Sequence, residues 1–448
     1  MRPSSVPRTG RIGEAFLAGS AAATGVLLVG TRLHPLPSLA LLTAALAPLA
    51  AVALVPSLRE GVRAVTVAWL AVPLGLLAVA MPVHVSHDIW SYAMYGRMVS
   101  HYHVSPYTHV PKEFPHDPIY RLVGWRHTPS VYGPLFTAAS AALMSVAGAS
   151  TLLARLAFQG LSAAALVVIA RMLWRRGTSP AVIAVLVLNP VVVVGIVNGG
   201  HNDLVVGALA LAAVFKLQEH RPVVAGALLA SAGLVKVSAL LAAAAAVVWA
   251  WRRWDRRSVV LMAATTGAST AVAYAVAGGE AAVAPLRTAA THWSHASVWA
   301  IVADRVPHLA ISNLSTIVIG VAVLVIGRRW QLDSSPAVVM GAFLLAYLLA
   351  APYVMPWYVG WALPLLALRP QSVLSRVAFV YASLLFVAYS LGSTKGVLGL
   401  PLRWSTLETQ VFAIIAIAVL AVWKRRSVPS LSHPSATMAG WTTTALPG

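Results

Sequence analysis

The stretch HVSHDIWSYAMYGRM, residues 84–98, follows a long apolar run and combines one aspartate with histidines and aromatic residues. Within it, Asp88, Tyr92 and Tyr95 are spaced at i, i+4 and i+7, which places them on one face of a helix. A carboxylate partly withdrawn from water among aromatic rings is suited to act as a general base. An aspartate at this position also suits the N-cap of the same helix, so both roles stay open.

The loop 84–130 that contains this stretch holds seven of the fourteen histidines of the chain. Long loops in compact proteins are usually functional or disordered, and the aromatic content of this one argues against disorder. The histidine spacings contain neither HExxH nor another paired metal signature, so we expect no metal ion. The chain has no cysteine, which excludes thiolate metal sites and thiol nucleophiles, and we expect no cofactor.

The composition identifies an integral membrane protein. Hydrophobic residues make up 59% of the 448 residues and charged residues only 10%, whereas a soluble domain has roughly a quarter charged residues. The net charge is +20, but the basic residues lie in short loops such as RRWDRR and WKRR between apolar runs. This pattern is typical of cytoplasmic anchors beside anionic lipid, so we expect membrane lipid and not nucleic acid as a partner.

Apolar runs long enough to cross a bilayer recur along the whole chain, and we count about fourteen of them. They predict an all-α, polytopic protein of the cell membrane with a single integral domain over residues 1–423. The remaining residues, 424–448, are rich in Ser, Thr and Pro after a basic anchor. We expect them to form a disordered cytoplasmic tail.

Charge clusters orient these segments, because basic residues favour the cytoplasmic side. The basic termini and the cluster 252–257 place both ends inside, and they place the loops 84–130 and 279–307 outside. One cluster disagrees, because RMLWRRG, which ends at Gly177, falls outside in a count of fourteen.

Three explanations of this disagreement stay open. Either that loop breaks the charge bias, or a helix within 131–173 does not span, or the run 222–250, with Lys236 in its middle, crosses twice. The simple count favours the inner side for NGGHND, residues 198–203, too far from Asp88 to share a site. The second and third explanations move that motif to the outer face, where it could join the site.

Four motifs occur in order along the chain: HDIWSYAMYGRM with SPYTHVP, PSVYGPLF at 129–136, NP with NGGHND at 189–203, and PYVMPWYVGWALPLLAL at 352–368. With them, the chain from about residue 84 to 370 resembles the actinobacterial polyprenol-phosphate-mannose-dependent α-1,6-mannosyltransferases, which are GT-C glycosyltransferases. One departure is Ser105 before Pro106 and Tyr107, where an asparagine is expected.

The resemblance implies a GT-C fold whose long first extracytoplasmic loop carries the catalytic acid. It implies transfer of mannose from polyprenyl-phosphate mannose to a mannan or glycolipid acceptor, with an α-1,6 linkage, inversion and an extracytoplasmic active site. The loop acid of the family matches Asp88 as general base, and YGPL and GHND match residues 132–135 and 200–203. Arg and His side chains of the two outer loops are suited to pair with the departing phosphate.

The candidate substrate-binding residues around Asp88 are Tyr92, Tyr95, Arg97, Arg126, His127, Tyr132, His201, Asp203, His292, Trp357 and Tyr358. The aromatic residues among them suit sugar stacking, and they equally suit the aromatic belt at a membrane surface.

Other functions stay open at this point. Another polyprenyl-phosphate-sugar transferase, such as an arabinosyltransferase, would share the same motifs, and a non-catalytic subunit of a wall-assembly complex is a further alternative. A polyprenyl-lipid transporter or flippase would instead predict internal repeats and ionisable residues at mid-membrane. The apolar runs show no repeat of fixed period and are almost free of acids.

Overall fold

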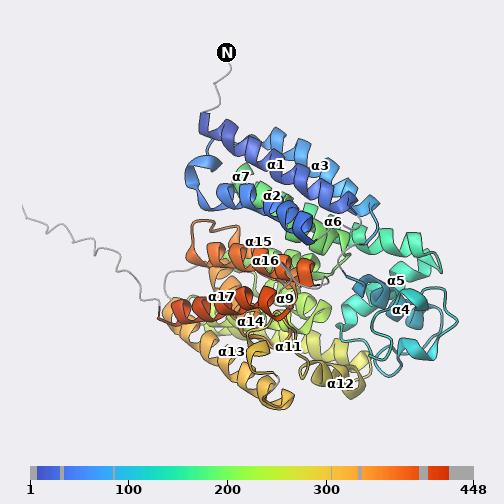
Figure 1. Cartoon of the computed structure of the whole chain (residues 1–448). Coiled ribbons are helices and arrows are strands. Elements are labelled where there is room, and N and C mark those ends of the chain that lie inside the picture. The colour runs from blue at the N-terminus through green and yellow to red at the C-terminus, as the bar shows by residue number, and fades with distance from the viewer. Residues whose placement is uncertain are drawn as a thin grey trace, which may run out of the picture.

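The computed structural model describes residues 8–30, 35–83, 86–303, 305–330, 335–392 and 402–422. Within these ranges the regular structure is entirely helical (Figure 1), which confirms the all-α prediction. The predicted tail 424–448 lies outside the described residues.

Five described helices contain a stretch long and apolar enough to cross a membrane. They are α1 (Arg8–Val29), α6 (Thr151–Arg175), α11 (Arg256–Val276), α13 (His308–Trp330) and α16 (Val373–Gly392). A sixth span follows if α7 (Pro180–Val187) and the π-helical η4 (Val191–Asn198), bent by 50°, count as one. The count of about fourteen segments therefore stays a prediction.

The other helices do not contain such a stretch within their described residues. They are α2 (Pro35–Leu54), α3 (Ala64–Ala80), α4 (Asp88–Ser100), α5 (Pro134–Ala147), α8 (Asp203–Gln218), α9 (Pro222–Val235), α10 (Leu240–Ala250), α12 (Glu280–Ala289), α14 (Pro336–Ala350), α15 (Leu363–Leu366) and α17 (Leu402–Val422). Short 3-10 turns connect them at η1 (Pro56–Arg59), η2 (Pro111–Glu113), η3 (Tyr120–Leu122), η5 (Val237–Ala239), η6 (Val298–Ile301) and η7 (Pro356–Trp361).

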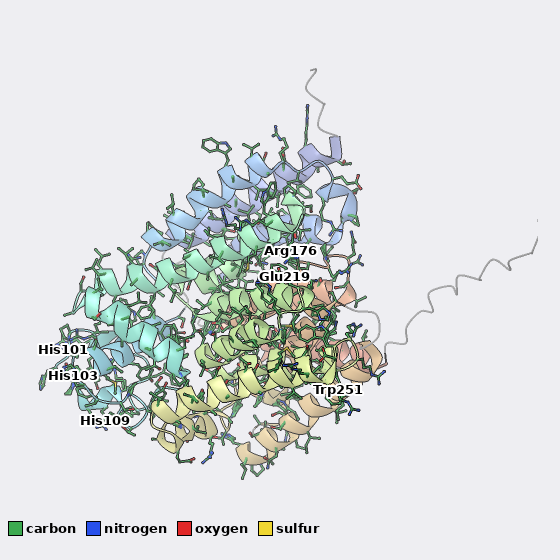
Figure 2. The ribbon with its side chains drawn as sticks, turned by 180° about the vertical axis from the view of Figure 1, so that it is seen from behind. His101, His103, His109, Arg176, Glu219 and Trp251 are labelled. Atoms are coloured by element: carbon green, nitrogen blue, oxygen red, sulfur yellow. The ribbon has the colours of Figure 1, made fainter. Side chains whose placement is uncertain are left out.

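Two opposite ends of the helical bundle differ in character. Figure 2 shows His101, His103 and His109 on one side of the molecule, the histidine end, and Arg176, Glu219 and Trp251 toward the other, the basic end. Arg176 donates to Glu219 over 3.0 Å, which joins the loops that follow α6 and α8.

The run 222–250 is two helices, not one. α9 starts at the basic end, directly after the Glu219 loop, and the backbone N–H of Gly133 donates to Val235 O over 3.2 Å where α9 ends beside α5. The chain turns at Lys236 and η5, and α10 leads back to Trp251 at the basic end. The run therefore leads from the basic end and back to it, which is the arrangement that one of the open alternatives describes.

Both ends of α5 lie at the histidine end. Directly before its first turn, the Gly133 N–H donates a hydrogen bond to Val235 O. Directly after its last turn, the Gly148 carbonyl accepts a 2.8 Å hydrogen bond from Arg97 of α4. α4 and α5 approach closely, because a Cβ at Gly96 would lie only 2.4 Å from Ser140 O. This helix, which lies within the run 131–173, thus packs along α4 and does not cross the bundle.

α5 removes one crossing from the simple count and the pair α9 and α10 adds one, so the total number of crossings does not change. α6 runs to the basic end, so RMLWRRG joins the other basic clusters, and α7 with η4 then returns to the histidine end. The expectation that NGGHND lies too far from Asp88 to share a site is therefore wrong: residues 198–203 lie beside α4. The physical reason is that α5 buries its apolar face against other helices near α4 and does not cross the bundle. The crossing therefore falls to α6, and the return of α7 and η4 brings the motif back to α4.

Candidate active site

Helix α4 places Asp88 at its first turn. The N-cap position belongs to His87, and Ser86 Oγ accepts from the Asp88 backbone N–H over 3.1 Å. The Asp88 carboxylate instead accepts a 3.0 Å hydrogen bond from the indole N–H of Trp125, across the loop. Its side chain is therefore directed away from the helix backbone, which disfavours the N-cap role and leaves the carboxylate available for chemistry.

Asp88 lines a cavity of about 290 Å³ at the histidine end. The walls come from α4, from loop residues 107–132, from α12 and from the segment 353–358. The predicted site residues that line it are Asp88, Tyr95, Tyr132, His292, Trp357 and Tyr358. The loop 107–132, the segment around α12 and the PWY motif, far apart in sequence, thus form one aromatic chamber in which Asp88 is the single carboxylate among the described lining residues.

His201 lies directly behind this carboxylate. Its Nδ1 is 3.8 Å from Asp88 Oδ2 and 3.1 Å from the Tyr92 hydroxyl oxygen. The imidazole stacks on Trp357 with ring centroids 4.0 Å apart. Burial, and then the charge of Lys236, lower the pKa of His201 well below its ordinary value. The ring is therefore neutral at pH 7, and it lies beside Asp88 as a dipole and not as a counter-ion.

A buried ion pair between Asp203 and Lys236 lies next to the chamber wall. Asp203 Oδ1 accepts from Lys236 Nζ over 2.9 Å and from Trp361 Nε1 over 2.6 Å. Lys236 Nζ lies 3.8 Å from the centre of the Tyr358 ring, which is a cation–π distance. Lys236 is a site residue that the prediction missed, and its sequence signal was a lone charge inside a long apolar run.

The surroundings of Asp88 favour its protonated form. Burial raises the pKa of the Asp88 carboxyl, and the Trp125 hydrogen bond and the Lys236 charge offset only part of that rise. A base whose pKa lies closer to neutrality takes a proton more effectively than an ordinary aspartate. The arrangement is therefore suited to proton abstraction inside the cavity.

Three predicted phosphate-binding residues do not line the cavity. Arg97 is buried, and its Nε donates to Asp117 Oδ2 over 2.7 Å, so it holds the loop onto α4. Arg126 donates to two backbone carbonyls of its own loop, each over 3.0 Å. His127 is exposed on the loop surface. Of the predicted basic residues, His292 reaches the chamber.

Two further predicted residues are fully buried behind the chamber wall. Tyr92 packs edge-on against Tyr132 with ring centroids 4.8 Å apart, and Asp203 has no exposed surface. They lie near Asp88 without lining the cavity. Among the described residues, no group of three or more His, Asp or Glu side chains is arranged to hold a metal ion.

Comparison with known proteins identifies relatives of this architecture. The family model described as alpha-(1->6)-mannopyranosyltransferase, N-terminal domain, matches residues 8–253. The chain is 28% identical over 348 residues to alpha-(1->6)-mannopyranosyltransferase A of Mycobacterium tuberculosis, which covers 69% of this chain and 65% of the relative. It is 31% identical over 164 residues to the protein of the same name from Corynebacterium glutamicum, which covers 35% of this chain and 33% of the relative. The chain spans less than two thirds of the length of either relative.

Proposed function

This chain belongs to the alpha-(1->6)-mannopyranosyltransferase family, and on that premise we propose that it transfers mannose from polyprenyl-phosphate mannose to a mannan or glycolipid acceptor. The observation that carries the proposal is the position of Asp88. It is the one carboxylate that lines an aromatic cavity of about 290 Å³ in the described part of the chain, and burial raises its pKa. A cavity of this size accommodates sugar rings, and its aromatic walls offer them apolar faces.

In the proposed reaction, the acceptor hydroxyl attacks the anomeric carbon as Asp88 takes its proton. The bond between the anomeric carbon and the phosphate oxygen breaks, and the polyprenyl phosphate leaves with the bonding electrons. One base and a single displacement give inversion at the anomeric carbon, by analogy with inverting glycosidases. The indole N–H of Trp125, 3.0 Å from Asp88 Oδ1, keeps the carboxylate in place.

The departing phosphate needs positive charge nearby. His292 lines the cavity and can contact the phosphate directly. Lys236 stands behind the Tyr358 ring, 3.8 Å from its centre, and contributes through its field. In this proposal His292, as a hydrogen-bonding side chain in the cavity wall, and Lys236, as the nearby cation, take the place of Arg97, Arg126 and His127.

The activity is tested with the purified full-length protein in detergent. Labelled polyprenyl-phosphate mannose and short α-mannosides are supplied, and products are separated by length. We expect a product one mannose longer, whose new linkage is α-1,6 by NMR. Transfer from polyprenyl-phosphate arabinose in place of the mannose donor would contradict the proposed sugar and favour an arabinosyltransferase.

We propose that the histidine end faces the outside of the cell membrane, where a polyprenyl-linked donor would present its sugar. Cysteines introduced by Thr108→Cys and Ser179→Cys test this in a chain without natural cysteine. Both positions are exposed. Thr108 adjoins His109 of the histidine end, and Ser179 follows Arg176 of the basic end by three residues. In intact cells, an impermeant thiol reagent should label the cysteine at 108 and not the one at 179. The reverse pattern would place Asp88 on the cytoplasmic side.

The pH dependence of the transfer rate is expected to follow the protonation state of Asp88. The base is active only when deprotonated, so the rate falls as the pH drops through the pKa of Asp88. Burial raises that pKa above the ordinary 3.8, so the acid limb of kcat should have its midpoint above this value. Initial rates across the pH range check this, and a limb centred at or below the ordinary aspartate value would contradict a buried base.

A further inference from the structure

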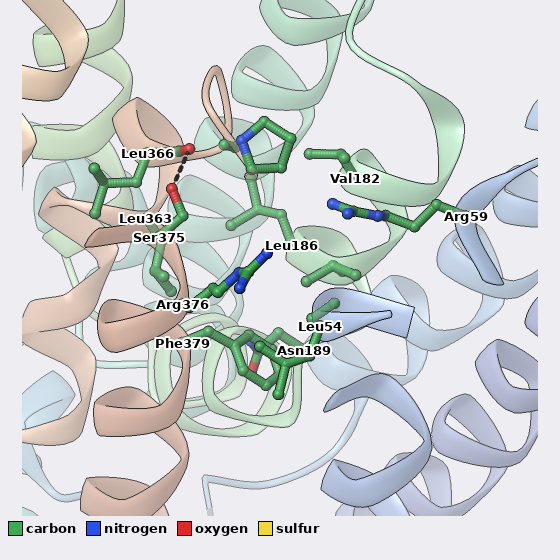
Figure 3. Close-up of a pocket in the computed structure, with 14 residues that line it drawn as sticks. Leu54, Arg59, Val182, Leu186, Asn189, Leu363, Leu366, Ser375, Arg376 and Phe379 are labelled. Carbon is green, nitrogen blue, oxygen red and sulfur yellow. Dashed lines mark hydrogen bonds between the residues drawn. The ribbon is translucent and has the colours of Figure 1, made fainter. Parts of the chain in front are cut away.

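A second cavity lies at the basic end, away from the Asp88 site. Figure 3 shows it between η1, α7, α15 and the first turns of α16, with Arg59 and Arg376 directed toward it from opposite walls. Its volume is about 60 Å³, which is room for a small polar group. Asn189, in the bend between α7 and η4, lies in its wall.

The two arginines bring positive charge to this cavity, and neither forms an ion pair with an acid among the described residues. No carboxylate lines it in the described part of the chain. Burial, and then the charge of Arg376, lower the pKa of Arg59. Two other arginines form ion pairs with glutamates: Arg176 contacts Glu219 at 3.0 Å and Arg63 contacts Glu14 at 2.9 Å.

Like charges that face one cavity repel each other, and the repulsion grows as water is removed. A shared anion converts that repulsion into attraction. The guanidinium fork matches two oxygens of a phosphate, and a strong charge-assisted hydrogen bond results.

The rest of the lining suits a phosphate that carries carbon. Asn189 Oδ1 accepts from the Val191 N–H over 3.0 Å, so its NH₂ group is the polar atom left to donate. Ser375 Oγ donates to Leu366 O over 2.9 Å and is committed to the fold (Figure 3). Leu54, Leu186 and Phe379 supply apolar walls, as basic lipid-headgroup pockets between helices do.

We propose that Arg59, Arg376 and Asn189 form a phosphate-binding site, separate from the Asp88 chamber, that takes the headgroup phosphate of an anionic lipid. The same chemistry would take free phosphate, and the two sources differ in what else they contact. A lipid headgroup also uses the apolar walls, whereas inorganic phosphate uses the two guanidiniums alone.

The test measures binding to the purified full-length protein in a zwitterionic detergent. Native mass spectrometry counts retained phosphatidylglycerol, with phosphatidylcholine as the zwitterionic control, and a thermal shift series adds inorganic phosphate alone. We expect one phosphatidylglycerol retained more tightly than phosphatidylcholine. Arg59→Gln and Arg376→Gln should each weaken it roughly tenfold, since each removes one charge-assisted hydrogen bond.

Arg175→Gln is the matched control, because Arg175 is exposed in the last turn of α6 and does not line the cavity. It should leave retention within about twofold of the wild type. Stabilisation by inorganic phosphate that both cavity variants abolish would support the phosphate site and assign it to free phosphate. The proposal would be overturned if the wild type, the double variant Arg59→Gln/Arg376→Gln and Arg175→Gln retained phosphatidylglycerol equally and were stabilised equally by phosphate. Unchanged melting without ligand shows that the variants are folded.

Discussion

Replacing Asp88 by asparagine is expected to lower mannosyl transfer by roughly a hundredfold to ten-thousandfold, the usual cost of losing a positioned base. Asparagine keeps the shape of the side chain, and its carbonyl oxygen can still accept from Trp125 as Asp88 Oδ1 does at 3.0 Å. It cannot take the proton of the acceptor hydroxyl. The measurement is the initial rate of transfer at saturating donor. Membrane insertion and the melting temperature of the variant protein are recorded alongside.

Glu113→Gln is the matched control for this variant. Glu113 is an exposed carboxylate of the same loop, and it accepts from the Val110 N–H over 2.9 Å without lining the cavity. Its amide variant should transfer at nearly the wild-type rate. If Asp88→Asn and Glu113→Gln are equally active, Asp88 is not the base, and its role is limited to holding Trp125.

The second large effect is expected at Asp203. Asp203→Asn leaves the Lys236 charge buried without its counter-ion, and breaking a buried ion pair in this way typically costs about 3–5 kcal/mol. The 2.9 Å contact with Lys236 and the 2.6 Å contact with Trp361 make this loss local to the Asp88 chamber. We therefore expect a lower melting temperature in detergent together with impaired transfer.

The double variant Asp203→Asn/Lys236→Met distinguishes charge from packing. Removing both charges leaves no unpaired ion, so most of the lost stability should return. Transfer should stay low, because the cation behind Tyr358 is gone. If the double variant melts no higher than the single one, the destabilisation comes from side-chain packing and the ion pair is not its cause.

Asp88 was predicted from sequence because its signal is local. The acid, the aromatic face at i, i+4 and i+7, and the exit from an apolar run all lie within one helical stretch. The all-α class followed from composition, since in lipid every backbone polar group must be satisfied within the segment. Neither inference depends on knowing which helices are neighbours.

Arg97 shows where such reasoning stops. An arginine two residues after Tyr95 was a reasonable phosphate ligand, but the fold of the loop brings Asp117 to 2.7 Å from it. The same residue type serves a buried salt bridge or a substrate, and only the partner distinguishes the two roles. That partner depends on how the loop folds, which the local pattern does not contain.

The sequence by itself determined the helical membrane class and the family motifs and pointed to Asp88 as the candidate base, because each signal lies in composition or in spacing within one segment. Only the tertiary structure decided that GHND lies beside Asp88, that 222–250 is a helical pair, and that Lys236 joins the site. Charge counting assigns sides by alternation, so a helix that packs without crossing and a run that crosses twice cannot be told apart from ordinary spans. Those outcomes depend on close approach between distant backbones, as where Gly133 meets Leu234 and Val235.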